Sequence, residues 1–213
     1  MADPLTYSGV QDFLISLVPP RESEMQAMEE YAKKTNFPII GPAAGHVCYQ
    51  IARLVGAQSI FEMGSGYGYS TAWFARAVKE NGGGVVHHVV WDEKLSKLAS
   101  GHLSRLGYDG TIEYHVAEAV ETLRDMPNSF DLIFCDIEKQ DYPAALPVIK
   151  AHLRSVGVLI VDNILWSGRI FDKEDHSVAT EGVRKFTRLM MQDTDWIASI
   201  LPVRDGMILA YKK

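Results

Sequence analysis

Oxygen-bearing side chains follow two apolar runs of the sequence, at the point where each run ends. Asp136 comes directly after residues 130–135, and Asp162 and Asn163 follow residues 156–161. Two carboxylates and an amide oxygen are hard ligands that suit Mg²⁺, Mn²⁺ or Ca²⁺, with water or substrate completing the coordination. The alternative is that each acid only caps the loop or helix that follows its strand. The residue types therefore indicate a metal site only if the two runs lie side by side.

A glycine-rich segment follows an earlier apolar run. Residues 62–70 read E-M-G-S-G-Y-G-Y-S, with glycine at three alternate positions. Glycines let the backbone approach a ligand, and the amides of a following helix favour a carboxylate. The third glycine of a dinucleotide-binding fingerprint would fall at Tyr69, which disfavours a nucleotide-dependent oxidoreductase. Glu62 instead suits the ammonium group of an amino-acid ligand, although a plain strand-to-helix turn is the alternative.

Strands alternating with helices would bring these residues together. Apolar strands are expected at residues 59–63, 85–91, 111–116, 130–135 and 156–161, with helices at 69–78 and 93–105 among them, and a closing strand pair at 196–201 and 207–211. Such a pattern predicts a parallel, doubly wound α/β sheet, with ligands at the carboxyl ends of its strands. The closing pair would add one antiparallel strand at an edge. Because consecutive strands are commonly neighbours, Asp136 and the Asp162–Asn163 pair are expected to converge.

The first 55 residues have helical spacing of their apolar side chains. A first helix has one face formed by Val10, Phe13, Leu14 and Leu17, and Pro19-Pro20 ends it. A second helix is expected at residues 25–34, a turn at 38–45 and a third helix at 47–55. No repeat or linker interrupts the sequence, so residues 1–213 are expected to form one domain, with N-terminal helices over 1–55 and an α/β core over 56–213.

Composition narrows the cellular setting. No apolar run approaches the roughly 20 residues that cross a bilayer, and Met1-Ala2-Asp3-Pro4 lacks the basic start of a signal peptide. Cys48 and Cys135 lie far apart in apolar surroundings, as expected of free thiols in a reducing compartment. A cytoplasmic protein without membrane contact is predicted. The net charge of −6 disfavours a nucleic-acid partner, which a local basic patch could still attract.

Four motifs together resemble the cation-dependent O-methyltransferases, the family of the caffeoyl-coenzyme A and catechol O-methyltransferases. The chain looks closest to the caffeoyl-coenzyme A branch, in a bacterial-type member. The matching segments are residues 61–71, whose E-x-G-x-G-x-G resembles the first motif of class I S-adenosylmethionine-dependent methyltransferases, then Asp136-Ile137-Glu138-Lys139 with Tyr142, residues 162–168 (D-N-x-L-W-x-G), and residues 201–206 (L-P-x-x-D-G). The resemblance spans nearly the whole chain. It implies a Rossmann-like methyltransferase fold with a mostly parallel, seven-stranded sheet.

The resemblance also implies roles for particular residues. Asp136, Asp162 and Asn163 correspond to the family's metal ligands, with Mg²⁺ the expected ion, and Lys139 and Asp136 to its catalytic residues. The positions implied for S-adenosyl-L-methionine are Ile40, Glu62, Gly64, Ser65, Gly66, Gly68, Tyr69, Ser70, Asp92, Ala117 and Asp136. A vicinal-diol, catechol-like phenol is the implied acceptor, and a homodimer the implied assembly. Lys139 would take the proton of the chelated hydroxyl or stabilise its oxyanion, which attacks the sulfonium methyl group.

Two positions depart from the family pattern. The family's second strand normally ends in an acid that accepts hydrogen bonds from the ribose hydroxyls, whereas this chain has Val90 there; Asp92 substitutes if the strand end is shifted. Val116 stands where glycine is usual after the third strand. These departures leave open a non-catalytic member with weakened cofactor binding, and a methyltransferase acting on a tRNA nucleoside is a further alternative.

Two further sets of polar residues are given no catalytic role. His87 and His88 are adjacent in a strand and point to opposite faces, so they cannot jointly bind one metal ion. Asp172, Asp175 and His176 lie in a polar segment that is expected to be solvated surface or a lid over the acceptor.

Overall fold

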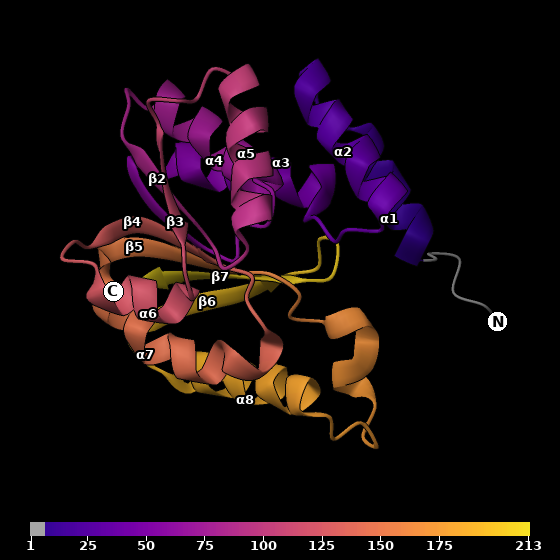
Figure 1. Cartoon of the computed structure of the whole chain (residues 1–213). Helices are drawn as coiled ribbons and strands as arrows, with labels where there is room; N and C mark the ends of the chain where they lie inside the picture. The colour runs from indigo at the N-terminus through magenta and orange to yellow at the C-terminus, as the bar shows by residue number, and fades with distance from the viewer. Residues whose placement is uncertain (1–6) are drawn as a thin grey trace.

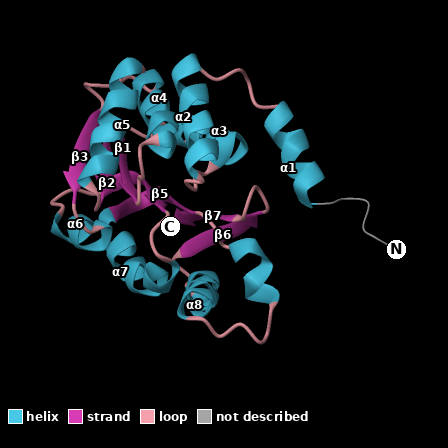
Figure 2. Ribbon diagram, turned by 45° about the vertical axis from the view of Figure 1, so that its right-hand side comes forward, coloured by secondary structure: helices cyan, strands magenta, loops and turns pink. Residues whose placement is uncertain are grey.

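A seven-stranded sheet with helices on both faces forms the centre of the protein (Figures 1 and 2). The computed structural model describes residues 7–213, so Met1-Ala2-Asp3-Pro4 and the prediction made from it lie outside the described residues. The strands are β1 (Ser59–Met63), β2 (Val85–Val90), β3 (Ile112–Val116), β4 (Phe130–Cys135), β5 (Leu153–Val161), β6 (Trp196–Leu201) and β7 (Met207–Lys212). Their order is β3-β2-β1-β4-β5-β7-β6.

The direction of the strands confirms the predicted doubly wound sheet. Strands β1 to β5 pair in parallel, whereas β7 is antiparallel to both β5 and β6. The antiparallel strand therefore lies one position in from the edge, and β6 is outermost. Because β4 and β5 are neighbours, the residues that follow them start from the same edge of the sheet.

Two groups of helices cover the sheet (Figure 1). The helices are α1 (Tyr7–Ser16), α2 (Ser23–Thr35), α3 (Gly41–Leu54), α4 (Tyr69–Glu80), α5 (Glu93–Arg105), α6 (Ala119–Asp125), α7 (Tyr142–His152) and α8 (Val178–Gln192), with short 3₁₀ segments η1 (Lys139–Asp141) and η2 (Trp166–Phe171). Helices α2 to α5 pack on one face, and α6 to α8 on the other. Side chains alternate between the faces, so Ile60 enters the first core and Phe61 the second. This burial on both sides explains why the strands read as continuous apolar runs.

The N-terminal region differs from its prediction in two ways. The predicted turn at residues 38–45 is wrong over its second half, because α3 already begins at Gly41. Pro42 lies in the first turn, where its missing N–H has no helical partner to lose. Phe13 in α1 and Leu17 just after it are 63% and 64% exposed, so this part of the predicted apolar face is not buried within the described chain.

Other features of the composition have structural counterparts. Cys48 and Cys135 are both buried and free, and burial raises the pKa of each thiol. None of the helices in residues 7–213 is long and apolar enough to cross a membrane.

Candidate active site

A cavity of about 710 Å³ opens at the carboxyl ends of the central strands. Its wall combines the glycine-rich segment after β1, the ends of β2 and β4, and the segments after β3 and β5. Ile40, in the segment before α3, closes one side. The volume is in the range of sites for small molecules and cofactors, and the position is where doubly wound sheets bind ligands.

The glycine-rich segment lets β1 and β4 approach each other beneath this cavity. Gly64 has a φ of +87°, and a Cβ atom there would lie 2.2 Å from the backbone oxygen of Asp136. Only glycine fits both the backbone conformation and the space. Gly64 therefore sets the position of Asp136 as well as the course of its own loop.

Replacement of Gly64 by alanine is expected to destabilise the fold by about 2 kcal/mol or more, because positive φ and overpacking each cost roughly 1–3 kcal/mol. Urea unfolding measures the change. Gly83→Ala is the matched control, since Gly83 has a φ of +103° but no atom of the described residues lies within 4 Å of the added Cβ. Equal losses in the two variants would contradict the proposed clash with Asp136.

Glu62 lies buried behind the loop and not on the cavity wall. Thr71 Oγ1 donates a hydrogen bond to its Oε2 atom at 2.5 Å, and His88 Nδ1 lies 2.9 Å from the same hydroxyl. Burial raises the pKa of Glu62 and lowers the pKa of His88 to about 3, so His88 is neutral. The Oε1 atom of Glu62 has no hydrogen-bond partner within residues 7–213, which leaves an acceptor for a ligand cation.

The acidic residues after β4 and β5 lie next to each other. Asp136 and Asn163 both line the cavity, and Asp162 is fully buried beside them, its backbone N–H donating to Cys135 O at 3.1 Å. Burial, followed by the negative charge of Asp136, raises the pKa of Asp162 to about 7. The predicted convergence of the two segments is confirmed.

The oxygen atoms of this group fit a hard divalent cation. Asp162 Oδ1 is buried and lacks a hydrogen-bond partner among the described residues, and Asn163 uses its Nδ2 to donate to Asp205 Oδ2 at 3.3 Å. Its amide oxygen is thereby left for another partner. Arg204 Nη1 donates to Asp162 Oδ2 at 2.9 Å and supplies part of the positive charge that this buried carboxylate requires.

Lys139 is held at the cavity by three hydrogen bonds. Its Nζ atom donates to Asp136 Oδ1 at 2.7 Å, Tyr142 Oη at 2.8 Å and Ile137 O at 3.2 Å. Tyr142 donates in turn to Asp162 O at 3.0 Å, and burial raises the pKa of this phenol, which keeps it protonated. The ammonium group of Lys139 also lies 5.8 Å from the ring of Trp166. The lysine is therefore a fixed, largely desolvated cation and not a solvated helix-start charge.

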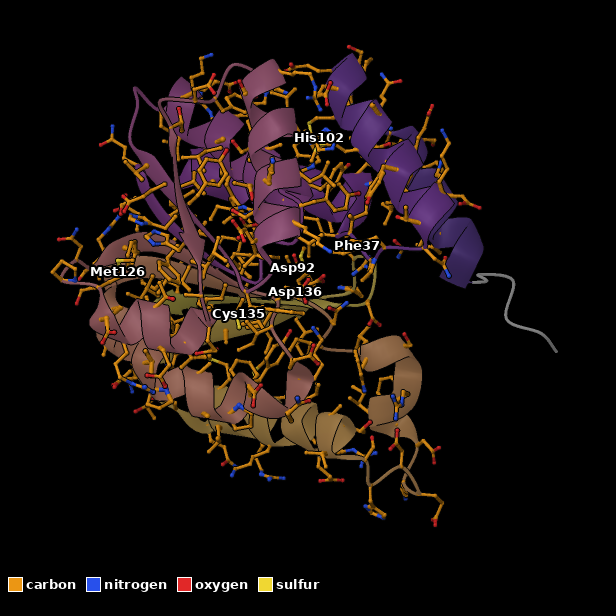
Figure 3. The ribbon with its side chains drawn as sticks, viewed as in Figure 1. Phe37, Asp92, His102, Met126, Cys135 and Asp136 are labelled. Carbon is orange, nitrogen blue, oxygen red and sulfur yellow. The ribbon has the colours of Figure 1, made fainter. Side chains whose placement is uncertain are left out.

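Most residues implied for the cofactor line the cavity: Ile40, Gly64, Ser65, Gly66, Tyr69, Ser70, Ala117 and Asp136. Gly68 does not, because it packs against α5. Asp92 does not either: its Oδ1 accepts from Lys94 N at 2.7 Å and Leu95 N at 3.3 Å as the N-cap of α5. Strand β2 ends at Val90, which lines the cavity, so the strand end is not shifted towards Asp92. Figure 3 labels Asp92 together with the cavity residues Phe37 and Asp136.

Two residues of the site received no role from the sequence. Arg204 holds Asp162, and Asp205 binds Asn163 and accepts from the backbone N–H of Ser167 at 2.6 Å. Both lie in the turn between β6 and β7, within the L-P-x-x-D-G motif. The L-P-x-x-D-G motif predicted a turn at this position. None of its residue types indicates that the turn contacts the residues that follow β4 and β5.

Known proteins resemble the chain over nearly its whole length. A family model described as O-methyltransferase matches residues 21–213. A catechol O-methyltransferase of Niastella koreensis is 26% identical over 218 residues, which cover 97% of this chain and 98% of the relative. The O-methyltransferase TomG from Streptomyces achromogenes, solved with S-adenosylmethionine, is 25% identical with a TM-score of 0.86 over 96% of each chain. The O-methyltransferase from Bacillus cereus, solved with SAH, is 26% identical with a TM-score of 0.86 over 96% of this chain and 97% of that one.

Proposed function

The chain belongs to the O-methyltransferase family and is an S-adenosylmethionine-dependent enzyme, and on this premise we propose that it methylates a hydroxyl group of a vicinal-diol, catechol-like small molecule with a divalent cation. The observation that carries the proposal is the meeting of Asp136, Asp162 and Asn163 beside the glycine-rich segment. The sulfonium methyl donor and the chelated methyl acceptor would then lie in the same cavity.

The cofactor would lie along the glycine-rich segment. The free Oε1 atom of Glu62 suits the ammonium group of its methionine part. The relatives solved with S-adenosylmethionine and SAH support the identity of the cofactor. Ala117 lies where the adenine is expected. Gly68 and Asp92 stand back from the cavity wall, so any part they play in binding is through the residues in front of them.

Asp136, Asp162 and Asn163 would hold the cation, with Mg²⁺ the expected ion because all three donors are oxygens. A bound divalent cation supplies Lewis-acid chemistry, which lowers the pKa of a coordinated hydroxyl. Lys139 would contribute in one of two ways: as a neutral amine its Nζ atom would accept the acceptor's proton, or as an ammonium group it would stabilise the resulting oxyanion. Asp136 and Tyr142 fix Nζ in place, and Trp166 lies beside it as a flat wall suited to an aromatic ring.

Val90→Glu is expected to tighten S-adenosylmethionine binding by about tenfold or more. Val90 lines the cavity at the end of β2, where the resemblance implies an acid that accepts from the ribose hydroxyls. A charge-assisted hydrogen bond contributes about 1.5–3 kcal/mol, and 1.4 kcal/mol is a factor of ten. Calorimetry measures the affinity, and Val178→Glu, at an exposed position outside the cavity lining, is the control. Weaker binding in Val90→Glu would mean that the ribose lies elsewhere.

Methyl transfer from labelled S-adenosylmethionine tests the function directly. Catechol-type diols, hydroxycinnamoyl thioesters and tRNA are offered as acceptors, each with Mg²⁺ and with a chelator. Cation-dependent labelling of a diol supports the proposal. Labelling of tRNA alone would overturn the proposed acceptor, and equal labelling with the chelator would overturn the proposed cation.

The departure at Val90 favours a second candidate, a member of the family with weak cofactor binding. The expected result for such a protein is that calorimetry detects no binding of S-adenosylmethionine.

A homodimer is part of the same proposal. Phe13 on α1 and Leu17 just after it expose large apolar side chains near the start of the described residues, a surface suited to burial against a second copy. Light scattering of the purified protein measures the assembly.

A further inference from the structure

Two imidazoles and a carboxylate lie close together on the sheet, and none of them belongs to the segments that carry the acidic residues of the cavity. His87 belongs to β2, whereas Glu113 and His115 belong to the edge strand β3. His87 is the register partner of Glu113 in the parallel pair, and His115 follows two residues later on the same face. His88 points to the opposite face, where it contacts Thr71. The cluster is therefore formed across strands and not by the adjacent histidines.

The spacing of the three side chains is that of metal ligands. His87 Nδ1 lies 3.0 Å from His115 Nε2, and Glu113 places Oε2 3.8 Å from His87 Nδ1 and Oε1 3.7 Å from His115 Nε2. One atom from each residue lies within 4.8 Å of the other two. Ligands held at about 2.0–2.1 Å around a tetrahedral ion are roughly 3.3 Å apart, a value within the observed range.

The surroundings make one ligand rigid and leave the site open. The ring of His87 is buried against Phe61 and Phe130, with centroids 6.0 and 5.3 Å away, which restricts its orientation. The side chains of His115 and Glu113 are 18% and 59% exposed. Solvent therefore reaches the cluster from the edge of the sheet, and Glu113 can close on an ion without disturbing the core.

We propose that His87, Glu113 and His115 bind a transition-metal dication such as Zn²⁺, with water in the remaining position. Imidazole nitrogens suit Zn²⁺, Co²⁺ and Ni²⁺, whereas Mg²⁺ prefers oxygen donors. The proposed site is thus chemically distinct from that of Asp136, Asp162 and Asn163. A metal ion here would join the edge strand β3 to β2, the two strands whose ends lead into the cavity-lining residues Val90 and Ala117.

The test uses tag-free protein from which a chelator has removed bound metal ions. This protein carries Asp162→Asn, which removes a ligand of the proposed oxygen site, and it is called the parent. Excess Mg²⁺ is present throughout. Zn²⁺ is titrated by calorimetry, and Co²⁺ by its visible absorption. One Zn²⁺-binding site is expected. His115→Gln in the same background is expected to weaken Zn²⁺ binding by at least about tenfold, because even the loss of a residue that only supports a metal ligand costs that much affinity. Zn²⁺ is also expected to raise the melting temperature of the parent and not of His115→Gln.

His176→Gln is the matched control, because His176 also lies near a glutamate, Glu181 at 3.4 Å, but without the second imidazole of the proposed set. This variant should bind Zn²⁺ like its parent. His115 is partly exposed, so its replacement is expected to leave the fold intact, which circular dichroism verifies. Absence of Zn²⁺ binding in the parent, or equal affinity in the parent and His115→Gln, would overturn the site.

Discussion

Lys139→Ala is expected to lower kcat by at least about 100-fold while leaving the affinity for S-adenosylmethionine little changed. General acid–base catalysis by a positioned group contributes about 10²–10⁴ in rate. Lys139 Nζ is fixed by Asp136 and Tyr142 at 2.7 and 2.8 Å, whereas the glycine-rich segment that would hold the cofactor lies on another element. Single-turnover kinetics with a diol acceptor, together with calorimetry for the cofactor, separate the two effects.

Lys150→Met supplies the control for loss of a paired lysine. Lys150 contacts two carboxylates, Asp193 at 2.6 Å and Asp195 at 2.7 Å, but lies on α7 away from the cavity lining. It should retain full turnover. Unchanged kcat in Lys139→Ala would reject the catalytic role, and a parallel loss of cofactor affinity would show that the lysine acts through the shape of the cavity.

The central sheet was predictable because its strands are buried on both faces. Strands β1 and β4 have their predicted bounds, and β2 ends one residue earlier than predicted. A continuous apolar run between polar ends has few alternative positions in such a sheet. Adjacency of β4 and β5 then followed from chain order, which is why the convergence of Asp136 and Asp162 could be inferred.

The start of α3 was harder to predict from the sequence, because the glycine and proline at its first residues are also typical of a turn. Gly41 and Pro42 look like a turn, yet the proline occupies the first helical turn and the apolar residues Ala43 and Ala44 behind it are buried in the core. Tertiary packing there outweighs the weak helix propensity of glycine and proline. Residue spacing alone does not report such packing.

The contacts around Asp162 depend on a long-range approach that local sequence does not encode. The turn between β6 and β7 folds back so that Leu165 N donates to Asp205 O at 2.8 Å and Ile164 N to Gly206 O at 3.0 Å. A Cβ at Gly206 would lie 2.5 Å from the side chain of Leu165. This close approach delivers Arg204 to Asp162. The register of β7 on β5 places the turn at this end of the sheet, and that pairing cannot be inferred from the local sequence.

Asp162→Asn is expected to abolish the response of turnover to Mg²⁺ and to lower kcat/KM by at least about 100-fold. Lewis-acid stabilisation is worth several kcal/mol, and each 1.36 kcal/mol is tenfold in rate. Asp162 Oδ1 is a buried acceptor without a partner among the described residues, so removal of this charge takes away the ligand of the group best prepared for a cation. Activity measured against Mg²⁺ concentration gives the result.

Arg204→Gln separates loss of the ion from loss of the ion pair. Both substitutions remove the ion pair between Arg204 Nη1 and Asp162 Oδ2, but only Asp162→Asn removes the carboxylate charge. If the carboxylate binds the cation, Arg204→Gln should keep its Mg²⁺ dependence and reach half-maximal activity at an equal or lower concentration, because a competing positive charge is gone. Persistent Mg²⁺ dependence in Asp162→Asn, or its loss in Arg204→Gln alone, would place the cation away from Asp162.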